Sequence, residues 1–543
     1  MMKKILDLNI RNTFFYIFSI YFLLGMHISL DHVGGHGLYL PFNIIGWIFV
    51  SLLIGMGLYQ ISSSKKLFIT KLQIYFLIGS ILLLVPFFYP NNVHASLALM
   101  RIMGLFGGLL LYLSFSQFQF SKEEKNKFVY VILGSVLIQI LLNHSSFIQP
   151  QFSAMTQKNI FASFLSTGAA LSLFLVVKEN YIINNSLNRI LVFCIPFFTS
   201  LQIYHIQSRT GYLSLIAGII FIIFYGNFRN KILFFWFGLL LTGLLIGSLT
   251  INNNTRPTKD IEYSENTRIV TYQLTYEMIK NNPIFGTGYG NFLSAFRHHY
   301  AKRKSDDPSL QTIGNSNMDH PHNELLFWTV EGGILPLVGL LIMAGSFLNM
   351  IWTVKQKKAW AILGILLPIL IHTQLELPFY ISLVHWIIFI FIIYLIDSEY
   401  GNHFETKVSF SSIFRFLSFV IPFVITVYMG TTLKTASVIT QFERTGYKDP
   451  SLLVSIVNPY SWQKKYETLI MKLNLNIAKK TKNTEKLNDY IEWAERYVDH
   501  SPYLFIYYDL ATAYEALGDG EKAWEVYRYA QYLYPGAKWR DEN

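Results

Sequence analysis

Long apolar stretches, each close to the length that crosses a bilayer, recur along this sequence and are separated by short polar loops. A helix rises only ~1.5 Å per residue, so about 20 apolar residues span the hydrocarbon, and such a helix pairs its backbone amides internally. Hydrophobic residues make up 52% of the 543 residues and charged residues only 14%, which excludes an ordinary soluble enzyme. We therefore predict an all-α, polytopic helical membrane protein.

The apolar stretches predict about thirteen transmembrane helices. The first has the basic flank of a signal peptide but no small-residue cleavage site, so we expect an uncleaved span. The expected spans are 12–31, 39–61, 67–89, 95–118, 127–147, 159–177, 188–206, 211–227, 231–250, 324–352, 359–375, 380–396 and 411–433.

The short loops with basic residues all fall on one side of this topology, which the positive-inside rule identifies as the cytoplasm. The rule also accounts for the net charge of +11 without nucleic acid as a partner. Cys194 is the one cysteine, so neither a disulfide nor a thiolate metal site can form. The basic residues are Lys65, Lys66, Lys122, Lys125, Lys127, Lys178, Arg189, Arg229, Lys231, Lys355, Lys357 and Lys358.

With the N-terminus inside, the two largest polar regions lie outside the cytoplasm, and the side of the second depends on the span count before it. We expect helices 1–9 in residues 1–250, a periplasmic loop in 251–323, helices 10–13 in 324–433, and a periplasmic helical domain in 434–543. The last domain resembles a tetratricopeptide unit, and it is either a docking module or a structural cap. Its pattern residues are Ala511, Tyr514, Leu517, Gly518, Ala523, Tyr527, Ala530 and Pro535.

Charges at membrane edges are costly, so each is a functional candidate. Arg209, between Gln207 and Gly211 at the outer end of an expected span, can offer several donors to a phosphate. A single arginine near a span end is more often an interfacial residue that snorkels to the surface. The polar neighbours of Arg209 favour a functional role.

Arg268, Tyr272 and Tyr276 recur at helical spacing in the large loop, which predicts an amphipathic helix near the membrane surface. Gly286, Gly288 and Gly290 follow it and allow tight turns and a close approach to a ligand. These glycines do not follow a strand, which excludes a dinucleotide fold.

The segment from Asp319 to Leu326 contains His320 and His322, either of which could accept a proton from a hydroxyl near neutral pH. Asp319, His320, His322 and Glu324 could equally ligate a divalent metal. Their spacing matches no defined zinc motif and arginines elsewhere could neutralise a diphosphate, so we expect catalysis without a metal. Asp319, Glu324 or Glu331 could orient the histidine. Glu376, on an outward-facing turn, could orient an acceptor, hold an arginine or form a structural ion pair.

In order and spacing, these motifs resemble those of the O-antigen ligase and polymerase superfamily. The resemblance rests on Gln207–Gly211, Arg268, Pro283–Gly288 and His322–Leu326. Within it, His372–Tyr380 followed by His385 and Trp386, together with Gln157–Ala162 and the tail, is similar to bacterial O-linked protein oligosaccharyltransferases of the PglL type.

The resemblance implies that a glycan is transferred en bloc from undecaprenyl diphosphate to a Ser or Thr hydroxyl of an exported protein, pilin-like or other. The enzyme would lie in the bacterial inner membrane with its active site facing the periplasm. The resemblance also implies inversion at the sugar and no cofactor or metal. His322 would be the catalytic base, and Arg209 and Arg268 would bind the diphosphate. Supporting residues at the same site would be Gln207, Tyr272, Gly288, Asn323, Glu324 and Glu376.

Three alternatives stay open at this stage. A sibling enzyme would join the glycan to lipid A core, or would extend a polysaccharide, by the same chemistry. A transporter of lipid-linked glycans would use the arginines only to bind headgroups.

Overall fold

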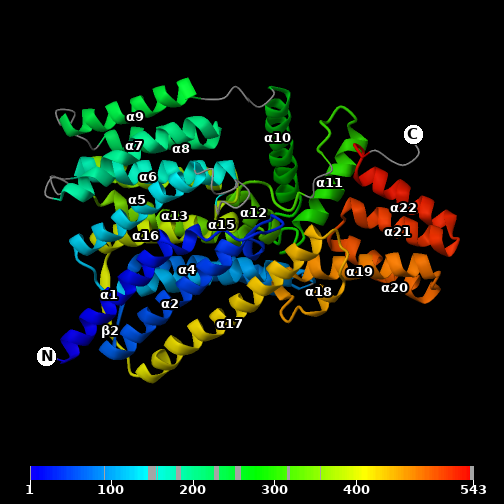
Figure 1. The fold of residues 1–543 in the computed structure, drawn as a ribbon, viewed down its shortest axis with the longest axis horizontal. Helices are drawn as coiled ribbons and strands as arrows, with labels where there is room; N and C mark the ends of the chain where they lie inside the picture. The colour runs from blue at the N-terminus through cyan, green and yellow to red at the C-terminus, as the bar shows by residue number, and fades with distance from the viewer. Residues whose placement is uncertain are drawn as a thin grey trace.

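The computed structural model describes residues 2–90, 92–144, 155, 157–178, 185–224, 231–250, 258–314, 318–354 and 356–537. Residues 251–257 and 315–317 of the expected loop, residues 145–147 of the fifth expected span, residues 225–227 of the eighth, and Arg229 and Lys355 lie outside the described residues. The chain is helical almost throughout, apart from a two-stranded sheet (Figure 1).

The helices before the large loop are α1 (Met2–Leu23), α2 (Pro41–Ser64), α3 (Lys71–Leu84), α4 (Leu99–Gln117), α5 (Lys122–His144), α6 (Lys158–Lys178), α7 (Ser186–Ile206), α8 (Arg209–Ile223) and α9 (Lys231–Thr250). The loop holds α10 (Thr258–Asn281) and α11 (Phe292–Asp306). Then follow α12 (Glu324–Gly332), α13 (Ile334–Trp352), α14 (Gln356–Thr373), α15 (Pro378–Ile381), α16 (Leu383–Tyr400) and α17 (Ser411–Arg444). The tail holds α18 (Ser451–Val454), α19 (Gln463–Thr481), α20 (Thr484–His500), α21 (Leu504–Leu517) and α22 (Gly520–Leu533).

Within the described residues, 10 helices are long and apolar enough to cross a membrane. Two shorter apolar helices, α8 and α14, pack beside them. Helix α1 packs on α2 and α5 and buries Phe14, Phe18 and Phe22 in the same core. Together these helices occupy the thirteen expected ranges, so the predicted all-α polytopic membrane fold is confirmed.

One end of the bundle gathers basic residues and the small sheet. Strands β1 (Lys66–Thr70) and β2 (His403–Lys407) pair antiparallel there. Lys178 and Lys358 both pair with Glu399, at 3.2 and 3.1 Å. Residues that the sequence placed on one side are therefore neighbours in space.

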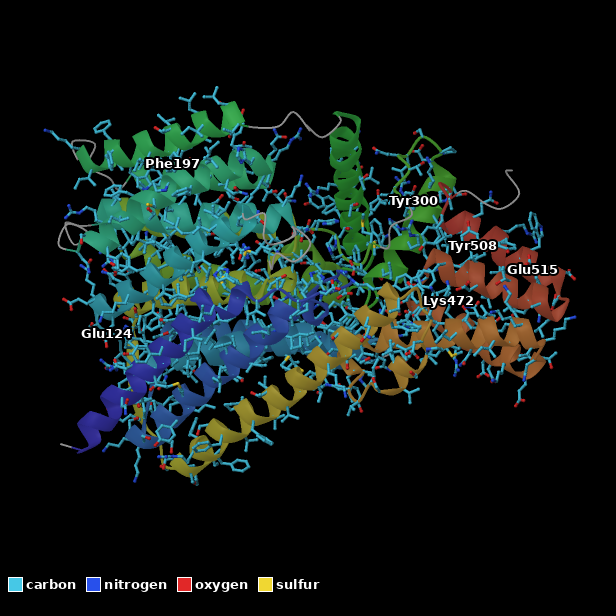
Figure 2. All side chains as sticks on the ribbon, in the orientation of Figure 1. Glu124, Phe197, Tyr300, Lys472, Tyr508 and Glu515 are labelled. Carbon is cyan, nitrogen blue, oxygen red and sulfur yellow. The ribbon has the colours of Figure 1, made fainter. Side chains whose placement is uncertain are left out.

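The opposite end carries the loop helices and the tail (Figure 1). Helix α10 runs crosswise to the bundle there, as expected of a helix along a membrane surface, and α11 contacts α20 and α22. Ser294 of α11 donates to the carbonyl of Asp499 at 2.7 Å. Figure 2 shows the separation of the ends, with Glu124 at one and Tyr300, Tyr508 and Glu515 towards the other. Loop and tail therefore form one assembly at this end.

The tenth expected span, 324–352, is wrong as a single helix. The chain breaks at Gly333, which has φ 71° and ψ −150°, a conformation essentially restricted to glycine. The backbone N–H of Ile334 donates to the carbonyl of Ile284 at 3.3 Å, so the loop is seated in the break. Only α13 is long enough to span, and α12 lies with the loop helices.

Other boundaries differ from the expected ones as well, and residues 67–70 of the third expected span belong to strand β1 instead. Helix α1 ends at Leu23 rather than 31, and α17 continues past 433 to Arg444. Ala436, Ile439 and Phe442 stay buried along that extension, because α17 packs there against the start of the tail. The tail thus begins on a helix that is continuous with a membrane span.

A Gly333→Ala substitution should lower the free energy of unfolding by roughly 1–3 kcal/mol, because a Cβ at this position would strike the carbonyl oxygen of Ile284. Gly345→Ala in α13 is the matched control, since nothing lies within 4 Å of its Cβ position. Thermal unfolding in detergent measures both. Equal melting temperatures for the two variants would contradict the role of Gly333.

Candidate active site

The centre of the site is a contact between two residues 54 positions apart. Nδ1 of His322 lies 2.6 Å from Oε1 of Glu376. The side chain of Glu376 is 7% exposed, whereas that of His322 is 28% exposed. A buried carboxylate therefore holds a histidine whose ring reaches the surface.

Local hydrogen bonds bring the two segments together. Asn323 caps α12 by accepting from the backbone N–H of Leu326 at 2.9 Å, and its amide donates to the carbonyl of Gln374 at 3.1 Å. The Tyr272 hydroxyl of α10 donates to the same carbonyl at 2.9 Å, with the carbonyl of His322 3.2 Å away. The turn that carries Glu376 is thus held from α10 and from α12.

Charges around Glu376 keep it ionised. Burial by itself would raise the pKa of Glu376, but the hydrogen bond and charge of His322, with the charge of Arg268, hold that pKa below its ordinary value. A carboxylate at this position accepts the Nδ1–H of His322 and leaves Nε2 free to accept a proton. Arg268 lies close enough for its charge to act on Glu376 and Tyr272.

His320 supports His322 from behind. Its Nδ1 accepts the backbone N–H of His322 at 3.1 Å, and the two rings meet edge to face at 4.4 Å. Burial lowers the pKa of His320 to about 4, so it is neutral at physiological pH. The contact also steadies the backbone of His322, which has φ 56°.

Arg209 is the first residue of α8 and its side chain is exposed. Ser214 of α8 donates to the carbonyl of Pro368 in α14, and Gly218 sits against Gly364 one turn further along, so the two helices run antiparallel. Extending this register by about five residues places the backbone of Arg209 at the level of Thr373, at the end of α14. Gln207 is exposed and ends α7 with φ 52°.

Gly286, Gly288 and Gly290 have the positive φ values that the turn requires. The space beside them is filled by the chain, because a Cβ at Gly286 would meet Glu331 and one at Gly288 would meet Asn291 and Asn92. The glycines therefore let the loop backbone pack closely against other parts of the protein, whereas the sequence had suggested a close approach to a ligand.

Glu324 lies at the start of α12, one residue after Asn323. One of its carboxyl oxygens is buried and has no hydrogen-bond partner among the described residues. Burial raises the pKa of Glu324 to about 8, despite the opposing charge of Arg101, so the group is mainly protonated near neutral pH. Glu376, not Glu324, contacts His322.

Sequence reasoning missed two parts of the site. Ser163 of α6 hydrogen-bonds to Nδ1 of His372 at 2.7 Å and to Nε2 of His385 at 2.8 Å, deep in the bundle. Serines are common inside membrane helices, so nothing in the sequence distinguished Ser163. Arg101, buried in α4 against Glu331, could have been found as a charge inside a span.

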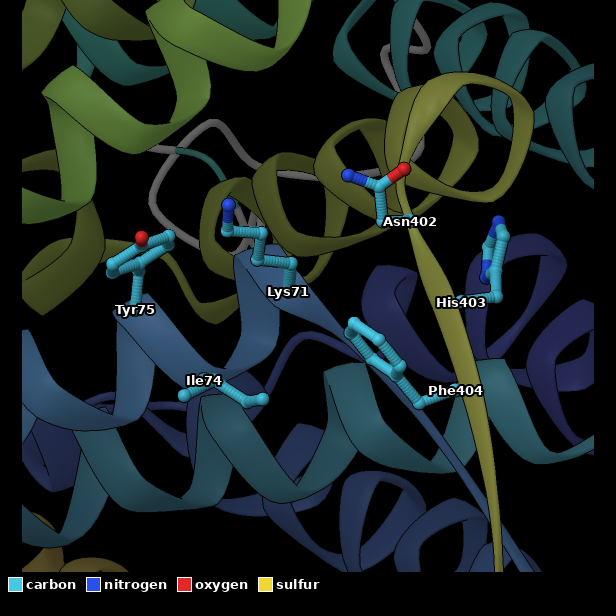
Figure 3. Close-up of a pocket in the computed structure, with 6 residues that line it drawn as sticks. All are labelled: Lys71, Ile74, Tyr75, Asn402, His403 and Phe404. Atoms are coloured by element: carbon cyan, nitrogen blue, oxygen red, sulfur yellow. The ribbon is translucent and has the colours of Figure 1, made fainter.

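His320, His322 and Glu376 could together hold a metal ion, since one ligand atom from each lies within 4.8 Å of the others. A cation there would displace the proton that Nδ1 of His322 shares with Glu376. A separate cavity of about 610 Å³ lies beside the small sheet, lined by Lys71, Tyr75 and His403 among others (Figure 3). It lies at the end of the bundle that holds β2, away from α10 and the other loop helices, and takes no part in this site.

Two protein-family models match the chain. The one described as O-Antigen ligase matches residues 194–342, and the one described as Virulence factor membrane-bound polymerase, C-terminal, matches residues 360–542. The chain belongs to the O-antigen ligase and polymerase superfamily. This membership indicates a ligase- or polymerase-type membrane enzyme. No curated protein matches the chain in sequence.

The two superfamily matches divide the site between them. The first contains Arg209, Arg268 and His322, and the second contains Glu376 and the tail. The His322–Glu376 contact therefore joins the two matched regions, and neither region has the pair by itself.

A Glu324→Gln substitution should change how stability depends on pH. Because the folded-state pKa of Glu324 is raised, its stabilising contribution is complete below the ordinary pKa of about 4.5 and is lost as pH rises through about 8. The variant should therefore gain melting temperature relative to wild type between pH 5 and pH 9. Glu485→Gln, at an exposed position in α20, serves as the control; parallel curves for wild type and Glu324→Gln would contradict the burial argument.

Proposed function

We propose that this chain transfers a glycan en bloc from undecaprenyl diphosphate to a hydroxyl of an exported protein, at the periplasmic face of the bacterial inner membrane. The observation that carries the proposal is the 2.6 Å contact between His322 and Glu376, beside the charge of Arg268. It combines a base for a hydroxyl with a cation for a departing diphosphate in one place.

In the proposed reaction His322 is the general base, the diphosphate is the leaving group and Glu376 stabilises the charged histidine. The acceptor hydroxyl gives its proton to Nε2 of His322, and its oxygen attacks the anomeric carbon from the face opposite the diphosphate. The bond from that carbon to the diphosphate oxygen breaks, and the electron pair leaves with the diphosphate. Glu376 stabilises the imidazolium through Nδ1–H, and the sugar inverts once.

Arg268 and Arg209 would bind the diphosphate while its charge grows. Arginine presents a planar set of donors that matches phosphate oxygens, and fixed donors of this kind are often the largest electrostatic term in catalysis. Helix α10 would hold Arg268 at the membrane surface, which is where the headgroup of a lipid donor lies. The undecaprenyl chain of the donor would lie among the apolar helices.

The acceptor distinguishes two candidate functions. A protein acceptor, as in the PglL type, is supported by a tail of helical pairs docked directly on α11 through Ser294 and His298, next to the site. An acceptor on lipid A core is supported by the match to the family described as O-Antigen ligase. A growing polysaccharide is supported by the match to the family described as Virulence factor membrane-bound polymerase, C-terminal, which covers the tail. The same base and arginines would serve either acceptor.

A transfer assay with purified chain in detergent tests the function. It needs extracted undecaprenyl diphosphate-linked glycan, candidate pilin-like proteins, lipid A core, and no ATP. We expect a glycosylated protein, with unchanged yield after exhaustive chelation of divalent ions. Glycan on lipid A core, or a lengthened polysaccharide, would mean that the acceptor is not a protein. The absence of transfer to any acceptor would favour a transporter. Inhibition by chelation that a divalent ion reverses would mean that His320, His322 and Glu376 bind a metal.

His322→Ala should abolish most turnover while the melting temperature stays close to that of wild type. Glu376→Gln should lower kcat by roughly 10- to 100-fold, because the neutral amide still orients the ring but no longer stabilises the imidazolium. Initial rates of transfer measure both. If His320→Ala were damaging and His322→Ala benign, the base would have to be reassigned to His320.

Arg268→Ala and Arg209→Ala should each lower the rate by roughly 10²-fold or more, because each removes a cation from the departing diphosphate. Arg303→Ala is the matched control, since that arginine belongs to the same loop but pairs with Glu277 at 3.1 Å. Near-normal turnover in both test variants would remove the arginine clamp from the mechanism.

A further inference from the structure

Arg101 is a buried cation that the proposed mechanism does not use. It lies in the first turn of α4 and its side chain is 6% exposed. Its Nη2 lies 2.6 Å from Oε2 of Glu331, whose side chain is 3% exposed. Burying both charges carries a desolvation cost that can exceed their mutual attraction, so such a pair is weak evidence for a purely stabilising role.

Aromatic rings enclose the guanidinium of Arg101. Its Cζ lies 4.6 Å from the ring centre of Tyr289, 4.4 Å from that of Phe327 and 4.3 Å from that of Trp328. Contacts of a cation with ring faces at these distances are attractive and become stronger away from water. Arg101 is therefore fixed to the glycine-rich loop through Tyr289 and to α12 through the other two rings.

Glu331 uses its remaining acceptors on the loop. Its Oε1 accepts the backbone N–H of Gly290 at 3.0 Å and that of Phe292 at 3.1 Å, and its backbone carbonyl accepts the N–H of Gly288 at 2.9 Å. Phe292 begins α11, so the carboxylate also sits at the N-terminus of a helix, where negative charge is favoured. One carboxylate thus joins α4, α11, α12 and the loop.

Two routes connect this junction to His322. The first is α12 itself, which starts at the Asn323 cap beside His322 and ends just after Glu331. The second is Phe327, whose ring lies 6.4 Å from that of His320, the residue that accepts the backbone N–H of His322. Glu376 reaches the site independently, on the turn after α14.

We propose that Arg101, acting through Glu331, is a positioning residue that sets His322 against Glu376. The proposal rests on the function proposed above. Arg101 contacts neither His322 nor Glu376. It fixes the membrane span α4 to α12, which starts beside His322, whereas Glu376 lies on the turn after α14. A displacement of about 1 Å at a reacting group can cost on the order of 10² in rate, so a remote anchor of this kind has a measurable effect.

The test compares the effect of Arg101→Met in wild-type and Glu376→Gln enzyme, by the glycan transfer assay. In the wild-type background we expect kcat to fall roughly 10²-fold while KM for the donor changes less than about 3-fold. In the Glu376→Gln background the further fall should be less than about 3-fold, because the contact that Arg101 serves is already weakened. Arg101→Lys, which keeps the charge but loses the planar guanidinium between the rings, should recover part of kcat.

Arg11→Met is the matched control. Arg11 pairs with Glu124 at 3.4 Å at the opposite end of the bundle, so its loss should leave kcat close to that of wild type (Figure 2). If Arg101→Met fails to fold, Glu331→Gln replaces it, because glutamine keeps an oxygen for the N–H groups of Gly290 and Phe292 but carries no charge. Melting temperature reports folding for every variant.

An equal loss of kcat in both backgrounds would overturn the positioning role, since it would mean that Arg101 acts only on overall integrity. Wild-type kcat in Arg101→Met would overturn it as well. Failure of the proposed function is distinguishable, because wild-type enzyme would then transfer no glycan or His322→Ala would remain active.

Discussion

The contact between His322 and Glu376 is the interaction on which the rest of the site depends. Its two halves come from the large-loop segment before α12 and from a turn between membrane helices, so it forms only when the loop is seated on the bundle. Three local features hold the loop on the bundle. They are the helix break at Gly333, the Asn323 cap of α12 and the hydrogen bond from the Tyr272 hydroxyl to the carbonyl of Gln374. Each is a local device for placing one ring against one carboxylate.

The bilayer explains why the site is built at the end of the bundle. Polar backbone outside helices is tolerated at membrane depth only where protein encloses it. The loop helices and the tail provide this enclosure at one end, whereas the basic residues and the small sheet occupy the other. Contacts such as His298 with Tyr529 make the tail part of the loop's support, and an acceptor that binds the tail would lie close to the proposed base.

The sequence predicted the spans well because continuous apolarity is a strong and local signal. It could not predict the break at Gly333, because the apolar pattern continues through that position. The break depends on the packing of the loop backbone at Ile284 against Ile334, which the sequence does not show. The sequence named His322, Arg268 and Glu376 but could not choose a carboxylate for the histidine, because that choice depends on how α14 ends next to α12. Arg101 and Ser163 needed the three-dimensional packing, as their partners are far away in the chain.

A structure of the chain with its intact lipid-linked donor bound, at a resolution that shows phosphate oxygens, tests the central claim most directly. The account predicts diphosphate oxygens within hydrogen-bond distance of the Arg268 guanidinium. It also predicts that the anomeric carbon presents its free face towards Nε2 of His322. A diphosphate bound elsewhere, with His322 and Glu376 remote from the sugar, would contradict it.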